Sequence, residues 1–167
     1  MAALVEPLAV GWNAVSLTDF KPDETALVTG AGPIGLAVLL SLKARDPHAR
    51  IFVSAPKSNR SELAITYGAE AVFDPKEVDV VEAVKAATNG DGVHIAYECA
   101  GVGSALPIAV QSVRSGGTIV NVSVYIKGEP VTMDPNLLTR FGRIYKGAMG
   151  YYPGCFAEVV EALVSGR

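Results

Sequence analysis

A glycine-rich turn between an apolar strand and an apolar helix is the feature that most constrains the fold. Residues 25–29 read TALVT, which is typical of a short buried strand. The turn GAGPIG follows at 30–35, and a long apolar run then ends at Asp46-Pro47, as expected for a helix. A GxGxxG pattern alone is weak because glycine is common. Placed between a strand and a helix, it is typical of a dinucleotide-binding βαβ unit.

Each glycine of this turn has a physical task in such a unit. Gly30 permits the tight turn, Gly32 lets the backbone approach a pyrophosphate, and Gly35 lets helix and strand pack closely. The helix that begins at Pro33 and Ile34 would hold the phosphates with its first amides and its dipole. An ordinary strand-to-helix turn that happens to use glycines is the alternative.

The rest of the chain repeats the alternation of strand and helix. This rhythm predicts an α/β Rossmann fold, a doubly wound parallel sheet of about six strands with helices on both faces. A polar, hairpin-like stretch is expected around residues 127–130. No linker or break in composition divides the chain, so residues 1–167 are predicted to form one domain. The expected strands cover 25–29, 50–54, 71–73, 93–97, 118–122 and 143–147, and the expected helices cover 3–15, 33–44, 59–67, 78–88, 104–114 and 155–165.

Composition excludes several classes of protein. Lys and Arg number 14 against 17 for Asp and Glu, so the chain lacks the basic surface that nucleic acids or anionic membranes attract. The two cysteines, Cys99 and Cys155, cannot build a disulfide scaffold or a four-thiolate zinc site. No signal peptide and no run of about 18 apolar residues is found. These patterns predict a soluble, cytoplasmic protein.

The end of the second strand is informative about the dinucleotide. An NAD site usually has a carboxylate there, bound to the adenosine ribose, but this chain continues Ser54-Ala55-Pro56-Lys57. Ala55 leaves room, and Ser54, Lys57 and Arg60 could meet a 2′-phosphate. The pattern therefore favours NADP(H) over NAD(H). Alternatively, Lys57 and Arg60 are solvent-exposed residues at the start of a helix and contact no cofactor.

Several dispersed strings resemble the cofactor domain of the zinc-dependent medium-chain alcohol and polyol dehydrogenases, in their butanediol and sorbitol dehydrogenase branch. The resemblance covers essentially all 167 residues and is much more specific than the glycine motif alone. The strings are ALVEPLAV at 3–10, GAGPIG at 30–35, YECAG at 97–101, GGTIV at 116–120 and FAEVVEAL at 156–163.

The resemblance implies roles for individual positions. Glu6 matches a carboxylate that lies at or beside the catalytic zinc, as a ligand or near-ligand. Ala55 stands where NAD-dependent relatives carry Asp or Glu, and Lys57 is close to the basic residue of NADP-dependent relatives. Four positions at the ends of later strands match stretches that line the adenine and nicotinamide side of the cofactor: Ala100, Gly101, Val122 and Ser123. Gly147 and Ala148 match positions near the nicotinamide carboxamide.

The family's reaction is hydride transfer between the nicotinamide and a secondary alcohol, polyol or ketone, with zinc as the Lewis acid. Because the sequence has no Cys-His-Glu cluster at metal-ligand spacing, the chain is interpreted as the cofactor domain of a longer enzyme. It is expected to bind NADP(H), to bind no zinc and to perform no turnover by itself, with the substrate held by the missing domain. The resemblance also implies a homodimer formed through the sheet edge near the later strands. A stand-alone NADP(H)-binding or sensing module and a zinc-free medium-chain reductase domain are the alternatives.

Overall fold

The computed structural model describes residues 2–125 and 130–166, in which helices and strands alternate after a 3-10 turn at Ala2–Leu4. The helices are α1 (Val5–Ser16), α2 (Pro33–Arg45), α3 (Asn59–Thr66), α4 (Val80–Ala87), α5 (Ala105–Ser112), α6 (Asn136–Phe141) and α7 (Cys155–Ser165). The strands are β1 (Thr25–Thr29), β2 (Arg50–Ser54), β3 (Ala71–Phe73), β4 (Val93–Glu98), β5 (Val113–Asn121) and β6 (Ile144–Gly147).

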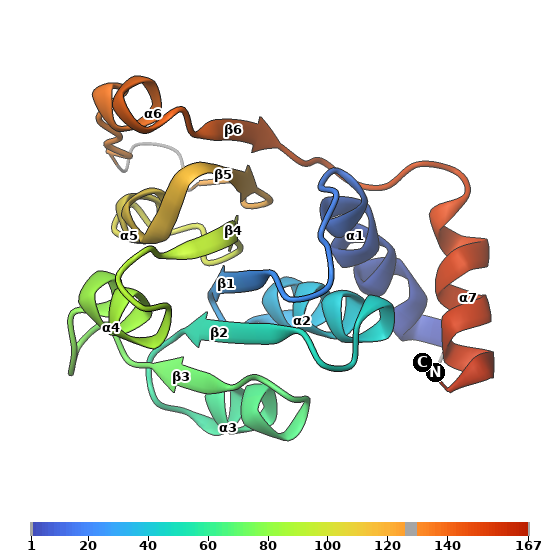
Figure 1. Cartoon of the computed structure of the whole chain (residues 1–167). Coiled ribbons are helices and arrows are strands. Elements are labelled where there is room, and N and C mark those ends of the chain that lie inside the picture. The colour runs from blue at the N-terminus through green and yellow to red at the C-terminus, as the bar shows by residue number, and fades with distance from the viewer. Residues whose placement is uncertain (1, 126–129, 167) are drawn as a thin grey trace.

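The strands form one parallel sheet with the order β3-β2-β1-β4-β5-β6 (Figure 1). The last residue of β1, Thr29, is level with Ser54 of β2 and with Glu98 of β4. The carboxyl ends of the central strands therefore meet at one edge. The predicted doubly wound α/β fold is confirmed.

Helices cover both faces of the sheet because alternate strand residues point to opposite sides. Val28 of β1 belongs to the apolar cluster under α1, α2 and α3, whereas its neighbour Leu27 belongs to the cluster under α4 and α5. Both side chains are fully buried, as expected for a parallel sheet covered on both faces.

In the described part of the chain no helix has the length and apolar character needed to cross a membrane.

Two contacts fix α1 against its neighbours. Gly11 lies so close to α2 that a Cβ at this position would approach the backbone of Ala37 to 2.5 Å. On the other side, Trp12 Nε1 donates to Glu158 of α7 at 2.6 Å, and the Tyr152 hydroxyl donates to the same carboxylate at 2.7 Å. Helices α1 and α7 thus form a layer beside α2 (Figure 1).

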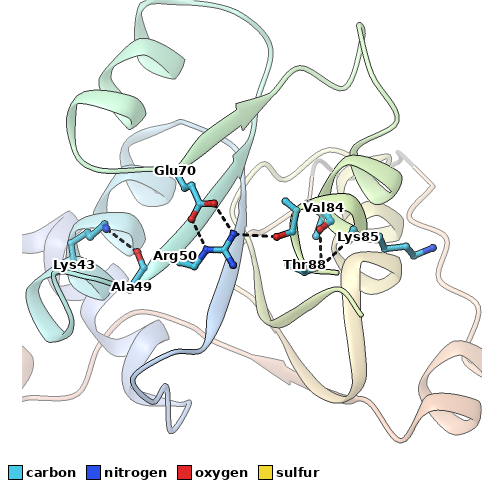
Figure 2. A network of polar contacts seen from close by, with 8 residues as sticks. Lys43, Ala49, Arg50, Glu70, Val84, Lys85 and Thr88 are labelled. Atoms are coloured by element: carbon cyan, nitrogen blue, oxygen red, sulfur yellow. Dashed lines mark hydrogen bonds and ion pairs between the residues drawn. The ribbon is translucent and has the colours of Figure 1, made fainter. Parts of the chain in front are cut away.

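A polar network holds the amino edge of the sheet, away from the glycine turn (Figure 2). Arg50, the first residue of β2, donates two hydrogen bonds to Glu70 at 2.8 and 2.7 Å and a third to the Ala87 carbonyl at 3.1 Å. Lys43 of α2 donates to the Ala49 carbonyl at 2.8 Å. These contacts tie β2 to α2, to the start of β3 and to the end of α4.

Most predicted elements lie within a few residues of the observed ones, but the strand expected at 118–122 begins earlier, at Val113, and one helix was not predicted. The expected helix through residue 114 ends at Ser112, and β5 begins at Val113, because a bulge containing Gly116 (φ +74°) lets the strand start early. Helix α6 was not predicted: it is only 6 residues long, none of its residues is fully buried, and its two leucines pack on the core only in part. The hairpin expected around residues 127–130 lies almost wholly outside the described residues.

Candidate dinucleotide-binding site

The glycine turn lies at the carboxyl edge of the sheet, where β1 passes into α2. Gly30 has a φ of +94°, a conformation that favours glycine, and its N–H donates to the Ser54 carbonyl at 2.7 Å. A Cβ at Gly30 would meet the Ala100 backbone at 2.9 Å, so the turn lies against the end of β4. Because β1 and β4 are neighbours and the chain winds away from them in opposite directions, the turn stands at the switch point where such sheets bind ligands.

The first turn of α2 offers backbone groups to an anion. Gly32 caps the helix in an extended conformation, and nothing lies within 4 Å of the position that a Cβ would take. A Cβ at Gly35, in contrast, would overlap the Gly30 carbonyl oxygen. The first N–H groups of a helix have no acceptors within it, so those of Ile34 and Gly35, with the helix dipole, can hold a pyrophosphate.

A buried carboxylate supports the opposite wall of this crevice. Glu98, the last residue of β4, has no exposed surface. Its Oε1 accepts hydrogen bonds from the N–H groups of Ala100 at 2.8 Å and Gly101 at 3.0 Å, and its Oε2 accepts one from the Tyr125 hydroxyl at 2.9 Å. Sequence reasoning missed this role, although a charged residue that ends an apolar strand needs such partners when buried.

The ends of β4 and β5 are joined beside the turn. The N–H groups of Val122 and Ser123 donate to the Glu98 carbonyl at 2.9 and 3.2 Å. A Cβ at Gly101 would lie 3.5 Å from the Ser123 Cβ. The four positions expected to line the adenine and nicotinamide side (Ala100, Gly101, Val122 and Ser123) are thus brought together next to Gly30.

Two titratable side chains near this wall are held neutral. Burial and the hydrogen bond to Glu98 raise the pKa of Tyr125. Burial, with a contribution from the Glu98 charge, raises the pKa of the Cys99 thiol well above its usual value. A neutral, buried thiol is a poor nucleophile, so Cys99 acts here as a small packing residue.

The residues expected at the adenosine end of the site lie at the end of β2, beside the glycine turn. Ser54 and Ala55 are buried, and the Ala55 N–H donates to the Phe73 carbonyl at 3.0 Å. Ser58 then caps α3 in a reciprocal pair with Ser61, whose hydroxyl accepts the Ser58 N–H at 2.8 Å. The exposed Lys57 and Arg60 side chains stand on either side of this cap.

The structure places Lys57 and Arg60 in different cavities. Arg60 lines one of about 450 Å³ together with Ala31 and Pro33 of the glycine turn. Lys57 lines a smaller one of about 270 Å³ together with Ala55 and several carboxylates. The two basic residues were expected to meet one phosphate, yet only Arg60 lies on the side of the turn. The carboxylates in the smaller cavity are those of Glu62, Asp74 and Glu77.

Among these carboxylates, Asp74 is held by two backbone hydrogen bonds, and the sequence analysis did not predict its place at the site. Its Oδ2 accepts the N–H of Lys57 and its Oδ1 accepts the N–H of Lys76, both at 2.8 Å. These two hydrogen bonds hold the pKa of Asp74 below its ordinary value, so the group is ionised at neutral pH. The available signal was its position directly after β3, at the same edge of the sheet as the glycine turn.

Comparison with known proteins agrees with this geometry. The sequence profile of the family described as zinc-binding dehydrogenase matches residues 33–165. The chain belongs to the zinc-binding dehydrogenase family. It is 36% identical to the (R,R)-butanediol dehydrogenase of Saccharomyces cerevisiae over 171 residues, which cover 99% of this chain and 44% of that protein.

Solved structures in this family have the same fold. The 2R,3R-butanediol dehydrogenase from Bacillus subtilis has a TM-score of 0.88 and 36% identity, covering 99% of this chain and 46% of that one. A zinc-binding dehydrogenase from Sinorhizobium meliloti 1021, solved bound to NADP, has a TM-score of 0.87 and 28% identity, covering 98% of this chain and 48% of that one. The chain spans less than half the length of these family members and corresponds to their nucleotide-binding domain.

The residues that the structure describes contain no candidate zinc site. No group of three or more His, Cys, Asp or Glu side chains among them could hold a metal ion. Glu6, the residue expected at or beside the zinc, lies exposed in the first turn of α1. It is far along the chain from Cys99 and Cys155, and neither cysteine joins it in a cluster.

Proposed function

We propose that the chain is the NADP(H)-binding domain of a zinc-dependent oxidoreductase that interconverts a secondary alcohol or polyol and a ketone. The observation that carries the preference is the buried Ala55 at the end of β2, where a carboxylate would bind the ribose hydroxyls and repel a 2′-phosphate. Lys57 and Arg60 supply positive charge on either side of this position. The butanediol dehydrogenases among the relatives support an alcohol or polyol as the substrate class.

The residues of the crevice fit a dinucleotide. The open space at Gly32 admits the pyrophosphate close to the backbone, and the first amides of α2 donate to its oxygens. Ala100, Gly101, Val122 and Ser123 form the wall against which the nicotinamide half would lie. When bound, the nicotinamide supplies or accepts a hydride. The chain's own contribution is to bind and orient the cofactor.

The carboxylates near Lys57 act against a 2′-phosphate. Asp74, Glu62 and Glu77 face the same cavity as Lys57, so they partly offset its charge. Because these opposing charges partly cancel, we expect the preference for NADPH to be modest. The dianion is expected on the Arg60 side of the loop, away from Asp74.

Calorimetric titration of the chain with NADPH and with NADH tests the proposal. We expect NADPH to bind about three- to tenfold more tightly, since an exposed ion pair contributes about 1 kcal/mol. Equal affinities would contradict the assignment of the phosphate pocket, and tighter binding of NADH would reverse it. Failure of both to bind would refute the dinucleotide site itself.

Zinc and a second subunit complete the proposal for the full-length enzyme. Glu6 is proposed to lie at or beside the catalytic zinc, whose other ligands belong to a part of the enzyme outside this chain. The outermost strand of the described sheet, β6, carries the exposed side chains of Ile144 and Tyr145, which supports pairing of two subunits along this edge. Cytoplasmic location stays a prediction from the sequence.

A further inference from the structure

We propose that a second anion site, for a phosphate monoester, lies at the amino edge of the sheet, away from the dinucleotide crevice. A cavity of about 460 Å³ opens there between α4, α5, α6 and the start of β5. Three cationic side chains line it against one carboxylate, that of Asp91. The cations are Lys85, Arg114 and Arg143, and the site is independent of the proposed cofactor preference.

Arg143 has a donor that the fold does not use. Its Nε is buried and has no hydrogen-bond partner among the described residues. The guanidinium stacks on the Phe141 ring, with its central carbon 4.5 Å from the ring centroid, so it is held in place. Because Nε itself has no accessible surface, a bound anion would contact the terminal Nη groups of this guanidinium, which lines the cavity.

Among the described residues, the side chain of Arg114 also meets no clear acceptor. Its Nη1 lies 2.8 Å from Nε2 of His94. The Nδ1 atom of the same ring faces the backbone N–H of Thr25 at 3.0 Å and must accept from it. The proton of a neutral imidazole then stands on Nε2, so His94 Nε2 and Arg114 Nη1 are both donors. An anion in the cavity offers the guanidinium a partner that His94 cannot.

The remaining lining residues define the ligand. Lys85 is engaged by Glu82 at 2.9 Å, so the two arginines carry the unpaired positive charge. Gln111 and Ser115 add neutral donors, which suit a ligand with several acceptor oxygens. Leu137 and Phe141 give the cavity an apolar side. Two guanidiniums favour a phosphate, and the apolar side favours an ester over the free ion.

The ¹H–¹⁵N spectrum of the chain reports on the site, because the Arg143 Nε–H belongs to a guanidinium that would be bound. Phenyl phosphate and inorganic phosphate are titrated separately at constant ionic strength. We expect saturable shifts of the Arg143 Nε–H and of the amides of residues 114 and 115, with tighter binding of phenyl phosphate. Shifts confined to Ile34 and Gly35 would place phosphate only in the cofactor turn and overturn the proposal.

Three variants separate a built site from general surface charge. R114Q and R143Q should each weaken phenyl phosphate about tenfold, because each removes a charge-assisted hydrogen bond. R140Q is the matched control, since Arg140 is exposed on α6 and does not line the cavity. An equal loss in all three variants would overturn the site. If R143Q does not fold, the exposed Arg114 still decides the test. Equal binding of inorganic phosphate and phenyl phosphate would overturn the ester assignment.

Discussion

The two ends of the proposed dinucleotide site differ in the groups they offer: one end offers backbone groups and the other offers side chains. At the glycine turn, the groups proposed to meet the pyrophosphate belong to the backbone: Gly30, Gly32 and Gly35 shape the turn, and the first amides of α2 are the proposed donors. At the adenosine end, the contacts come from side chains such as Lys57, and a neighbouring strand contributes the opposing charge of Asp74. We therefore propose that the turn determines whether a dinucleotide binds and that the side chains determine which one.

The largest expected effect follows from a methyl group at the turn. G35A should lower the free energy of unfolding by about 3 kcal/mol or more, because its Cβ would overlap the Gly30 carbonyl and the backbone must shift. G32A is the matched control: its Cβ meets nothing within 4 Å, so stability should stay within about 1 kcal/mol. Denaturant unfolding measures both, and equal losses would contradict the different roles assigned to the two glycines.

G32A should nevertheless lose NADPH and NADH alike, since its new methyl group takes the space in which the pyrophosphate approaches the backbone. Calorimetric titration of the folded variant checks this. If the variant lost one dinucleotide and still bound the other, the turn would discriminate between NADPH and NADH. The division of roles between the turn and the side chains would then be wrong.

The second expected effect is a loss of stability when Glu98, which holds the backbone beside the glycine turn, is replaced. E98A should cost about 2–4 kcal/mol of stability, because the N–H groups of Ala100 and Gly101 lose their buried acceptor. E98Q keeps one acceptor for these groups and supplies an N–H toward Tyr125, so it should cost less than about 1.5 kcal/mol. Thermal unfolding distinguishes the two. An E98Q variant as unstable as E98A would show that the charge, rather than the acceptor, is needed.

At the adenosine end, reversing the charge at Lys57 should act on one cofactor only. K57E should weaken NADPH about tenfold through repulsion of the 2′-phosphate and leave NADH within about twofold. Stability should not change, because the Lys57 side chain is exposed. Titration with both dinucleotides provides the measurement. An unchanged ratio of the two affinities would remove Lys57 from the site.

The smallest effect is expected from Asp74. In D74N the amide oxygen can still accept the Lys57 N–H, but the negative charge is gone, so NADPH should bind about threefold more tightly and NADH unchanged. The pKa of Asp74 lies below its ordinary value, so the charge is lost only in more acidic solution and the gain should be constant across neutral pH. E77Q removes a charge from the same cavity and should act in the same direction, since Glu77 also offsets the charge of Lys57.

The sequence predicted the fold and the turn because both depend on local pattern. The strand at Thr25–Thr29, the glycines and the apolar α2 are consecutive, so their geometry can be inferred without the rest of the chain. The strands Arg50–Ser54 and Ala71–Phe73 were likewise predicted to the residue.

The remainder depends on contacts between distant segments. Asp74 reaches the Lys57 loop only because β3 lies beside β2, and Glu98 meets Tyr125 only because the chain returns past β4 after β5. No spacing in the sequence reports these pairings. The early start of β5 had the same cause, since its bulge is fixed by pairing with β4.

The ³¹P resonance of the 2′-phosphate of bound NADPH tests the central claim most directly, because it reports on the one group that distinguishes the two cofactors. A free phosphate monoester takes up its second proton with a pKa of about 6. Held beside Arg60, the phosphate should stay dianionic to lower pH, so its resonance should titrate at least about half a unit below that of free NADPH. A bound phosphate that titrates as in free solution, or at higher pH, would contradict the account.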